Sequence, residues 1–169
     1  MEPLLRISIW KQFIQAKYGE IYLSLYIDQQ KQINKEYKIL TLVFSGLGVL
    51  GWKIFDQNQY LLLLSTGITS IIQLIALLSN QIFLSEETLS RIGKLRHEYL
   101  LHFNKLELLW QKIEAKKITD DDARNSYSQL KNEYVSIITE DSQFAVKELK
   151  KVKKKAGEKT RTYFKNFYS

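Results

Sequence analysis

Neutral polar side chains interrupt two long apolar stretches in the middle of this chain. Thr66, Gln73 and Asn80 recur at every seventh position within residues 57–85, a run of 29 residues without a charge. Seven residues make nearly two turns of an α-helix, so these three side chains share one face. We call the complete set the polar stripe; it consists of Ser45, Thr66, Thr69, Ser70, Gln73 and Asn80.

Uncharged hydroxyl and amide groups have two uses in an apolar surrounding. They hydrogen-bond helices to one another, or they line a path filled with water. Because two helices cannot enclose a pore, the second use requires several copies of the chain. Such a pore would discriminate weakly between ions, since it has no ring of charges. The stripe by itself favours neither use over the other.

The second group of side chains that could bind a ligand is basic and aromatic, and it lies in the last part of the sequence. Nine of the 25 lysines and arginines fall within residues 147–169, where only Glu148 and Glu158 oppose them, so this segment holds the net charge of +7. Lysines with aromatic rings suit single-stranded nucleic acid, and they equally suit anionic lipid headgroups. We rank the lipid slightly higher, because the central segments are apolar. The residues expected to bind an anionic ligand or lipid are Lys150, Lys151, Lys153, Lys154, Lys155, Lys159, Arg161, Tyr163, Phe164 and Lys165.

Side chains that support catalysis or metal binding are few. The sequence has no cysteine, and its two histidines, His97 and His102, are five residues apart, which turns them to different faces of a helix. Residues 120–122 are three consecutive aspartates, which we interpret as the acidic first turn of a helix and not as a metal site. No glycine-rich phosphate loop with its lysine occurs in the sequence. We therefore expect no enzymatic activity, no metal and no cofactor.

The polar stripe needs two helices that cross a membrane. Residues 57–84 exceed the roughly 20 apolar residues that a bilayer requires, and Lys38 and Lys53 enclose a second uncharged run of 14 residues. We predict spans at about 37–55 and 57–84. The link between them is so short that the helices must run antiparallel. Lysines and arginines gather outside the two free ends of this hairpin, which predicts that the N- and C-termini face the cytoplasm.

Helices are expected on both sides of the membrane hairpin. Residues 1–36 have the spacing of an amphipathic helix that packs on other helices, and residues 86–149 predict a helical hairpin. The first arm of that hairpin has a heptad seam in which His102 would be neutral and satisfied by a neighbour, and Thr119 with Asp122 predicts the start of the second arm. The seam consists of Ile92, Leu95, Tyr99, His102, Leu106, Leu109 and Ile113.

These elements predict an all-α membrane protein. It would have an N-terminal amphipathic helix, an antiparallel hairpin of two transmembrane helices over residues 37–85, a cytoplasmic helical hairpin, and a basic-aromatic tail at residues 150–169. We expect the second span to continue directly into the cytoplasmic seam as one rod.

This order of elements resembles the SLATT family of bacterial effectors with two transmembrane helices. The resemblance depends on the helix that contains Trp10, the two spans joined by a tight turn, the helical extension behind them, and residues 118–134, ITDDDARNSYSQLKNEY. The lysine-rich tail is not part of the family's pattern. The resemblance implies an oligomeric pore or disruptor of the bacterial cytoplasmic membrane that acts in antiphage defence. It also implies control by a nucleotide that a partner nucleotidyltransferase makes.

The sequence therefore predicts a membrane effector that forms a homo-oligomeric channel, of four or more copies, gated by an anionic nucleotide or oligonucleotide. Opening would depolarise the membrane and arrest the infected cell. A second interpretation is a non-conducting anchor whose cytoplasmic helices recruit a partner. A third is a soluble helical bundle with a buried apolar hairpin.

Overall fold

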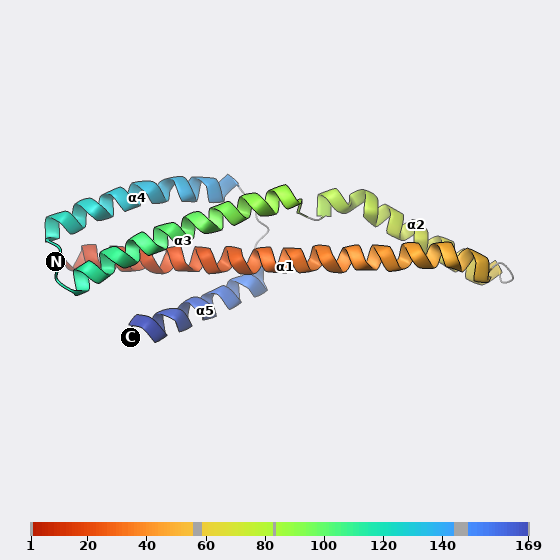
Figure 1. Cartoon of the computed structure of the whole chain (residues 1–169), viewed down its shortest axis with the longest axis horizontal. Coiled ribbons are helices and arrows are strands. Elements are labelled where there is room, and N and C mark those ends of the chain that lie inside the picture. The colour runs from red at the N-terminus through yellow and green to blue at the C-terminus, as the bar shows by residue number, and fades with distance from the viewer. Residues whose placement is uncertain (1, 56–58, 83, 144–148, 169) are drawn as a thin grey trace. The chain divides into compact units, whose positions relative to one another are not determined.

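The fold is all-helical in the part of the chain that the computed structural model describes. The backbone is described for residues 2–55, 59–82, 84–143 and 149–168. Within these helices, side chains are not described for residues 47–55, 59, 61, 62, 64, 65 and 76–82. The described residues form no strand, which confirms the all-α class (Figure 1). The helices are α1 (Pro3–Phe55), α2 (Gln59–Ile82), α3 (Glu86–Glu114), α4 (Asp120–Gln143) and α5 (Lys150–Tyr168).

The helices belong to two compact units. Unit 1 comprises residues 1–27 and 90–169, and unit 2 comprises residues 28–89. Helix α1 contributes to both, because it does not end at residue 36, where the sequence predicted a boundary. The sole proline of the chain is Pro3 at the first position of α1, where a missing amide hydrogen costs nothing. No helix-breaking residue therefore separates the amphipathic part of α1 from its apolar part.

The prediction of one rod from the second span into the seam is wrong, because α2 and α3 are separate helices. Ser85 caps the N-terminus of α3: the amide of Thr88 donates a hydrogen bond to Ser85 Oγ at 3.1 Å. Glu86 and Glu87 follow in the first turn, where the helix dipole favours carboxylates. These residues are a start signal for a new helix, and the rod is interrupted there.

The predicted start of α4 is confirmed. The amide of Asp122 donates to Thr119 Oγ1 at 3.2 Å, and the Thr119 hydroxyl donates to the Asp122 carboxylate at 2.6 Å. Just before this cap, α3 ends in a turn closed by Lys116, whose φ of 53° lies in the left-handed region. The amide of Lys117 donates back to the carbonyl of Lys112 at 2.9 Å, which is the hydrogen bond of a Schellman turn. The break between α3 and α4 is thus determined by local sequence.

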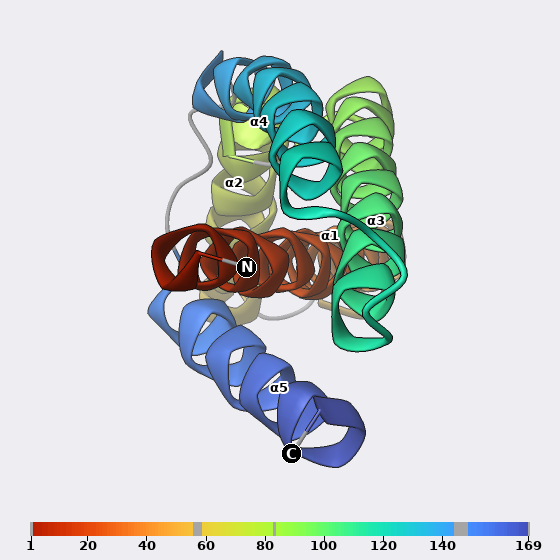
Figure 2. The same cartoon turned by 90° about the vertical axis from the view of Figure 1, so that its left-hand side faces the viewer.

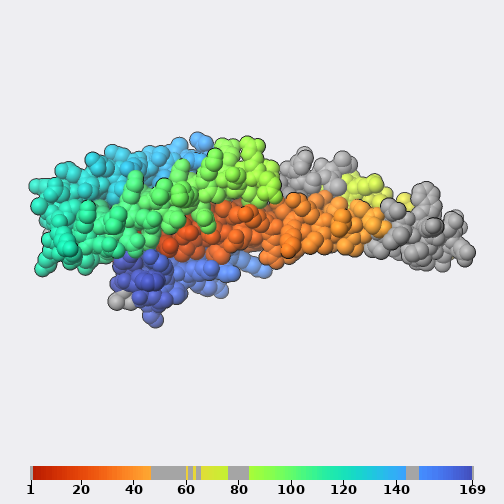
Figure 3. Space-filling model, in the orientation of Figure 1, coloured from red at the N-terminus to blue at the C-terminus, as the bar shows by residue number. Residues whose placement is uncertain are grey.

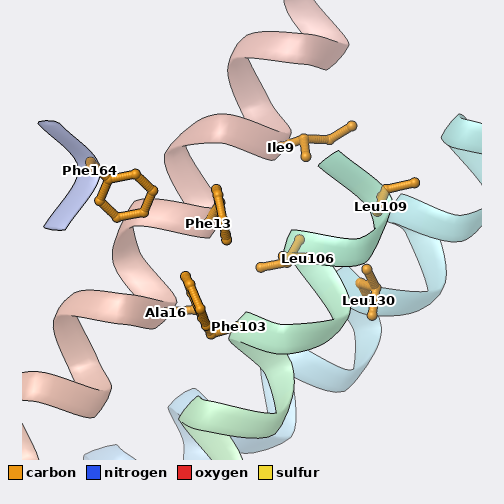
Figure 4. Close-up of a cluster of buried hydrophobic side chains, with 8 residues drawn as sticks. All are labelled: Ile9, Phe13, Ala16, Phe103, Leu106, Leu109, Leu130 and Phe164. Atoms are coloured by element: carbon orange, nitrogen blue, oxygen red, sulfur yellow. The ribbon is translucent and has the colours of Figure 1, made fainter. Parts of the chain in front are cut away.

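The core of unit 1 forms where α1, α3, α4 and α5 meet. Phe13 of α1 is fully buried; its ring stacks on Phe103 of α3 at 4.8 Å and meets Phe164 of α5 edge-on at 5.1 Å. Figure 4 shows Phe13 between these two side chains. The whole buried cluster consists of Ile9, Phe13, Ala16, Phe103, Leu106, Leu109, Leu130 and Phe164.

Residues 150–168 form a packed helix, whereas the sequence predicted a basic-aromatic tail. Val152, Ala156, Thr160 and Phe164 are buried, and their spacing of four residues makes one continuous helix face. In unit 1, α1 lies between α5 on one side and the α3–α4 pair on the other (Figure 2). The space-filling view shows α5 directly against the first part of α1 (Figure 3). The lysines of α5 are exposed.

Unit 2 is an antiparallel hairpin. Helix α2 returns along the second part of α1 (Figure 1), and two contacts close the hairpin at its open end. The side-chain amide of Asn34 donates to the carbonyl of Leu84 at 3.1 Å, and Lys38 Nζ lies 4.0 Å from Glu86 Oε1. This geometry agrees with the antiparallel arrangement that the short link predicted.

Truncating the buried ring of α5 tests whether this helix belongs to the core. Phe164→Ala should lower the free energy of unfolding by about 3 kcal/mol, because it removes a buried aromatic ring and leaves a cavity. Phe167→Ala is the matched control; this ring on the same helix is 69% exposed, so its loss should cost less than about 0.5 kcal/mol. Thermal unfolding of both variants, followed by circular dichroism in detergent, gives the comparison. Equal effects would show that α5 is not packed.

Candidate functional site

Unit 2 exposes large apolar side chains along both of its helices. Leu42 is 76% exposed on α1, and Leu63 is 71% exposed on α2. Large apolar side chains that are exposed close together are typical of surfaces that contact lipid or another protein chain. Its described members with more than one third exposure are Ile39, Leu40, Leu42, Val43, Tyr60, Leu63, Ile68, Ile71, Leu74 and Ile75.

Among the residues that the structure describes, no helix combines the length and the apolar character needed to cross a membrane. The two predicted spans, 37–55 and 57–84, include many side chains outside the described set, at residues 47–59, 61, 62, 64, 65 and 76–83.

The polar stripe lies on the surface of the hairpin wherever it is described. Ser45, Thr66, Ser70 and Gln73 are exposed, Thr69 is half-buried, and Asn80 lies outside the described residues. The Ser70 hydroxyl donates to the carbonyl of Thr66 at 2.9 Å, one turn earlier in α2. Gln73 is exposed, so its amide can reach a group outside the hairpin.

The basic side chains of α5 form one exposed face. Lys150, Lys151, Lys153, Lys154, Lys155, Lys159, Arg161 and Lys165 are all exposed. The predicted aromatic half of this site is absent from that face, because Phe164 is only 8% exposed and Tyr163 is half-buried. Lys17 of α1 lies 4.5 Å from the centre of the Tyr163 ring, so this ring already has a cation over it. Phe164 therefore stabilises the core and does not stack on a ligand, which corrects its assignment as a binding residue.

A shallow pocket of about 490 Å³ lies near the N-terminal end of α1. Trp10 and Trp110 form its aromatic floor, with ring centres 4.7 Å apart. Arg6 also lines it: the guanidinium lies 5.3 Å from the centre of the Trp110 ring and 2.5 Å from a carboxylate oxygen of Glu114. The guanidinium of Arg6 thus already contacts the Trp110 ring and the Glu114 carboxylate, the groups with which this pocket could bind a cation.

A larger groove, of about 580 Å³, lies among α1, α3, α4 and α5 in unit 1. Its wall contains four tyrosines, and we call it the tyrosine groove. Tyr99 is its most buried ring, and it rests directly on α1 because Gly19 has no side chain; a Cβ added to Gly19 would lie 2.6 Å from that ring. The groove is lined by Gln15, Tyr18, Gly19, Tyr22, Leu23, Tyr99, Tyr134, Ile138, Asp141, Ser142 and Lys153.

Hydrogen bonds and burial fix the inner wall of the tyrosine groove. The Tyr99 hydroxyl donates to Asp141 Oδ2 at 2.9 Å, which joins α3 to α4. Burial raises the pKa of Tyr99, and the negative charge of Asp141 raises it further. Burial also raises the pKa of Tyr134. Both phenols therefore stay protonated at neutral pH and offer neutral hydrogen-bonding groups to the groove.

His102 supports the groove from behind. Its ring stacks on Tyr134, with centres 4.9 Å apart, and the buried Gln12 side chain places its Nε2 3.0 Å from His102 Nε2. In this arrangement the Gln12 amide donates and His102 Nε2 accepts, which puts the proton of the neutral ring on Nδ1, a buried atom without a hydrogen-bond partner among the described residues. The pKa of His102 is lowered to about 4, chiefly because the ring is buried. The nearby charge of Glu133 raises this pKa, and that of Lys105 lowers it. The neutral histidine expected at this seam position is therefore what the structure supports.

Several of these groups could not be found from the sequence. Gln12 and His102 are 90 residues apart, and neither the spacing of α1 nor that of α3 indicates their contact. The pairing of Gly19 with Tyr99 has no local signal either. The tyrosines at positions 18, 22 and 26 do follow a helical spacing of four residues, which is a readable signal for one aromatic face.

No cluster of three or more histidine, cysteine or acidic side chains that could hold a metal ion occurs among the described residues. Asp120, Asp121 and Asp122 occupy the first turn of α4, as the sequence predicted. No protein-family model, no curated protein and no solved structure matches this chain.

The buried histidine predicts how the stability of the protein depends on pH. The pKa of His102 is lower in the folded chain than its usual 6.5, so the unfolded chain binds the proton more tightly. Stability should fall as the pH drops from about 6.5 toward 4, by up to about 3 kcal/mol for this group. Unfolding free energies measured across this range should show a shallower slope in His102→Leu. His97→Gln, a change at an exposed histidine on the same helix, should keep the slope of the wild type, and an unchanged slope in His102→Leu would contradict the assignment.

Proposed function

We propose that the chain is a membrane effector whose unit 2 inserts into a bilayer, assembles with other copies into a pore, and is controlled through unit 1. The observation that carries this proposal is the apolar surface of unit 2, on which Leu42, Tyr60 and Leu63 are all more than two thirds exposed. An apolar surface of this kind is stabilised in hydrocarbon and is unfavourable in water.

The charges of unit 2 support insertion. Between Lys38 and Glu86, the sequence has two charged residues: Lys53, near the C-terminal end of α1, and Asp56, which falls in the sequence between α1 and α2. Helix α2 has 24 residues, which is about 36 Å at 1.5 Å per residue and exceeds the roughly 30 Å of a hydrocarbon core. The apolar part of α1 is shorter, and lysine side chains at its ends can extend to the headgroups. In this arrangement the turn faces away from the cytoplasm.

Basic residues support the orientation. Lysines 31, 35 and 38 precede the hairpin, and Arg91, Lys94 and Arg96 follow it. By the positive-inside rule, both ends of the hairpin then face the cytoplasm of a bacterial inner membrane. Unit 1 lies on that side in this proposal, with its lysine-bearing α5.

Assembly of several copies is supported by the exposed stripe and by two glycines. Gly46 and Gly67 have no atom within 4 Å of the position that a Cβ would occupy, so neither is needed for a contact within the chain. Small residues on a membrane helix let a neighbouring helix approach closely. In a homo-oligomer of four or more copies, Gln73 could line water between chains, which a single hairpin cannot enclose.

The signal that controls the pore would be anionic, because unit 1 exposes the basic face of α5. A nucleotide or oligonucleotide made by a partner nucleotidyltransferase fits this charge, and the resemblance to SLATT effectors places such a signal in antiphage defence. The signal can shift the pore between open and closed states only if it binds the two states with different affinity. The proposal involves no catalytic step, metal or cofactor.

Release of a dye from proteoliposomes tests the pore. The wild-type chain should release the dye under at least one condition in a series without ligand, with mononucleotides, and with a single-stranded oligonucleotide. Gln73→Leu should reduce release at least tenfold, because it removes the polar group that lines water. Ile71→Leu is the matched control on the other side of α2, and this swap of similar volume should leave release unchanged.

The outcome that contradicts the pore is equally specific. A chain that integrates into liposomes, resists extraction by carbonate, and releases no dye under any condition is a non-conducting anchor. A chain that stays in the soluble fraction without detergent contradicts both membrane functions.

A further inference from the structure

We propose that the tyrosine groove of unit 1 is the binding site for a mononucleotide, with the base on the tyrosine wall and the phosphate at Lys153. The inference rests on the proposed function, because it assigns a place to the anionic signal. Of the tail residues that the sequence suggested as ligand contacts, it keeps Lys153 for the phosphate and places the base on residues of α1, α3 and α4.

The volume and the wall of the groove suit one nucleotide. A space of about 580 Å³ falls within the range of small-molecule sites, roughly 300–1,000 Å³. Tyr18 and Tyr22 lie side by side on α1 with nearly parallel rings, at an angle of 17° and 6.0 Å between centres. Both are half-buried, so part of each ring faces outward. Aromatic faces of this kind bind the flat surface of a base by stacking.

The inner wall is held in place before any ligand arrives. Tyr99 is seated on Gly19 and hydrogen-bonded to Asp141, and Tyr134 is stacked on His102. A wall that does not rearrange on binding loses little conformational entropy, which favours affinity. The helices that form this wall, α1, α3 and α4, are the same helices that form the core.

Charge determines which way a nucleotide would lie. Asp141 and Lys153 line the same groove from α4 and α5. A carboxylate repels a phosphate but accepts hydrogen bonds from the amino group of a base, whereas a lysine ammonium attracts the phosphate. The base edge therefore points to Asp141 and the phosphate to Lys153. Gln15 and Ser142 at the same groove provide neutral hydrogen-bonding groups for the sugar.

Other occupants fit the groove less well. A purely apolar ligand would displace water from Asp141 and Lys153 without offering either of them a polar group. An inorganic anion would use Lys153 alone and would leave the tyrosine wall without a role. The combination of aromatic faces, one acceptor carboxylate and one cation matches an amino-bearing base joined to a phosphate.

Binding of three defined probes to the full chain in detergent tests the site. The probes are adenosine 5′-monophosphate, adenosine without a phosphate, and ribose 5-phosphate without a base. Isothermal titration should give the highest affinity for the mononucleotide, weaker binding of adenosine, and the weakest binding of ribose 5-phosphate. Thermal unfolding should shift upward in the same order, since a ligand stabilises the folded state that binds it.

Two variants separate the two halves of the site. Lys153→Ala should weaken the mononucleotide roughly tenfold and leave adenosine unchanged. Tyr22→Leu should weaken both, because it removes a stacking surface. Lys159→Ala on the exposed face of α5 and Tyr60→Leu in unit 2 are the matched controls, and they should bind all three probes as the wild type does.

The result that overturns the inference is absence of mononucleotide binding at millimolar concentration, or binding that Lys159→Ala weakens as much as Lys153→Ala. The dye-release measurement on the same preparation separates this failure from failure of the pore. Dye release without nucleotide binding overturns the groove alone. Nucleotide binding without dye release overturns the pore alone.

Discussion

The arrangement of unit 1 depends on the ring of Phe13. This side chain is fully buried, stacks on Phe103 and meets Phe164 edge-on, so one residue of α1 joins α3 and α5. A buried aromatic ring contributes several kcal/mol to stability through area and packing, on the order of 3 to 5 kcal/mol when it is truncated. That contribution explains why α5 packs on the bundle although its sequence is dominated by lysine. The basic side chains are therefore carried on a helix that is packed against the core.

The two units differ in how they bury apolar side chains. Unit 1 buries an apolar cluster among four helices, although some apolar side chains on its surface, such as Leu4, Leu108 and Phe167, are exposed. Unit 2 has two helices, which cannot enclose a core, and its apolar residues remain exposed, as Leu42 and Leu63 show. The difference follows from the number of helices that meet in each unit. The packed helices of unit 1 bury its apolar cluster. The exposed apolar side chains of unit 2 would be buried by lipid and by further copies of the chain.

Local signals predicted what local interactions determine. The Thr119–Asp122 cap, the buried seam of α3 and the neutral His102 could all be inferred from residues within a few turns of one another. The cap at Ser85 was equally local, but the adjoining apolar run outweighed it and led to the prediction of one rod. The position of Phe164 was missed because the charge of residues 150–165 outweighed a spacing of four that starts at Val152. The tyrosine groove could not be predicted, because it brings together residues from four helices.

Phenylalanine and tyrosine are distributed differently in the core and in the groove of unit 1. The buried Phe13 ring contacts Phe103 and Phe164 together with Trp10 and Tyr168, whereas the groove is lined by four tyrosines. Phenylalanine would fill nearly the same volume as tyrosine without a hydroxyl to satisfy, so a tyrosine wall is favoured only where its hydroxyls have partners. Tyr99 has Asp141 as such a partner, and the groove keeps a polar edge beside its aromatic faces. A ligand can therefore engage this wall without disturbing the Phe13 cluster, and substitutions in the groove can alter binding while the bundle stays folded.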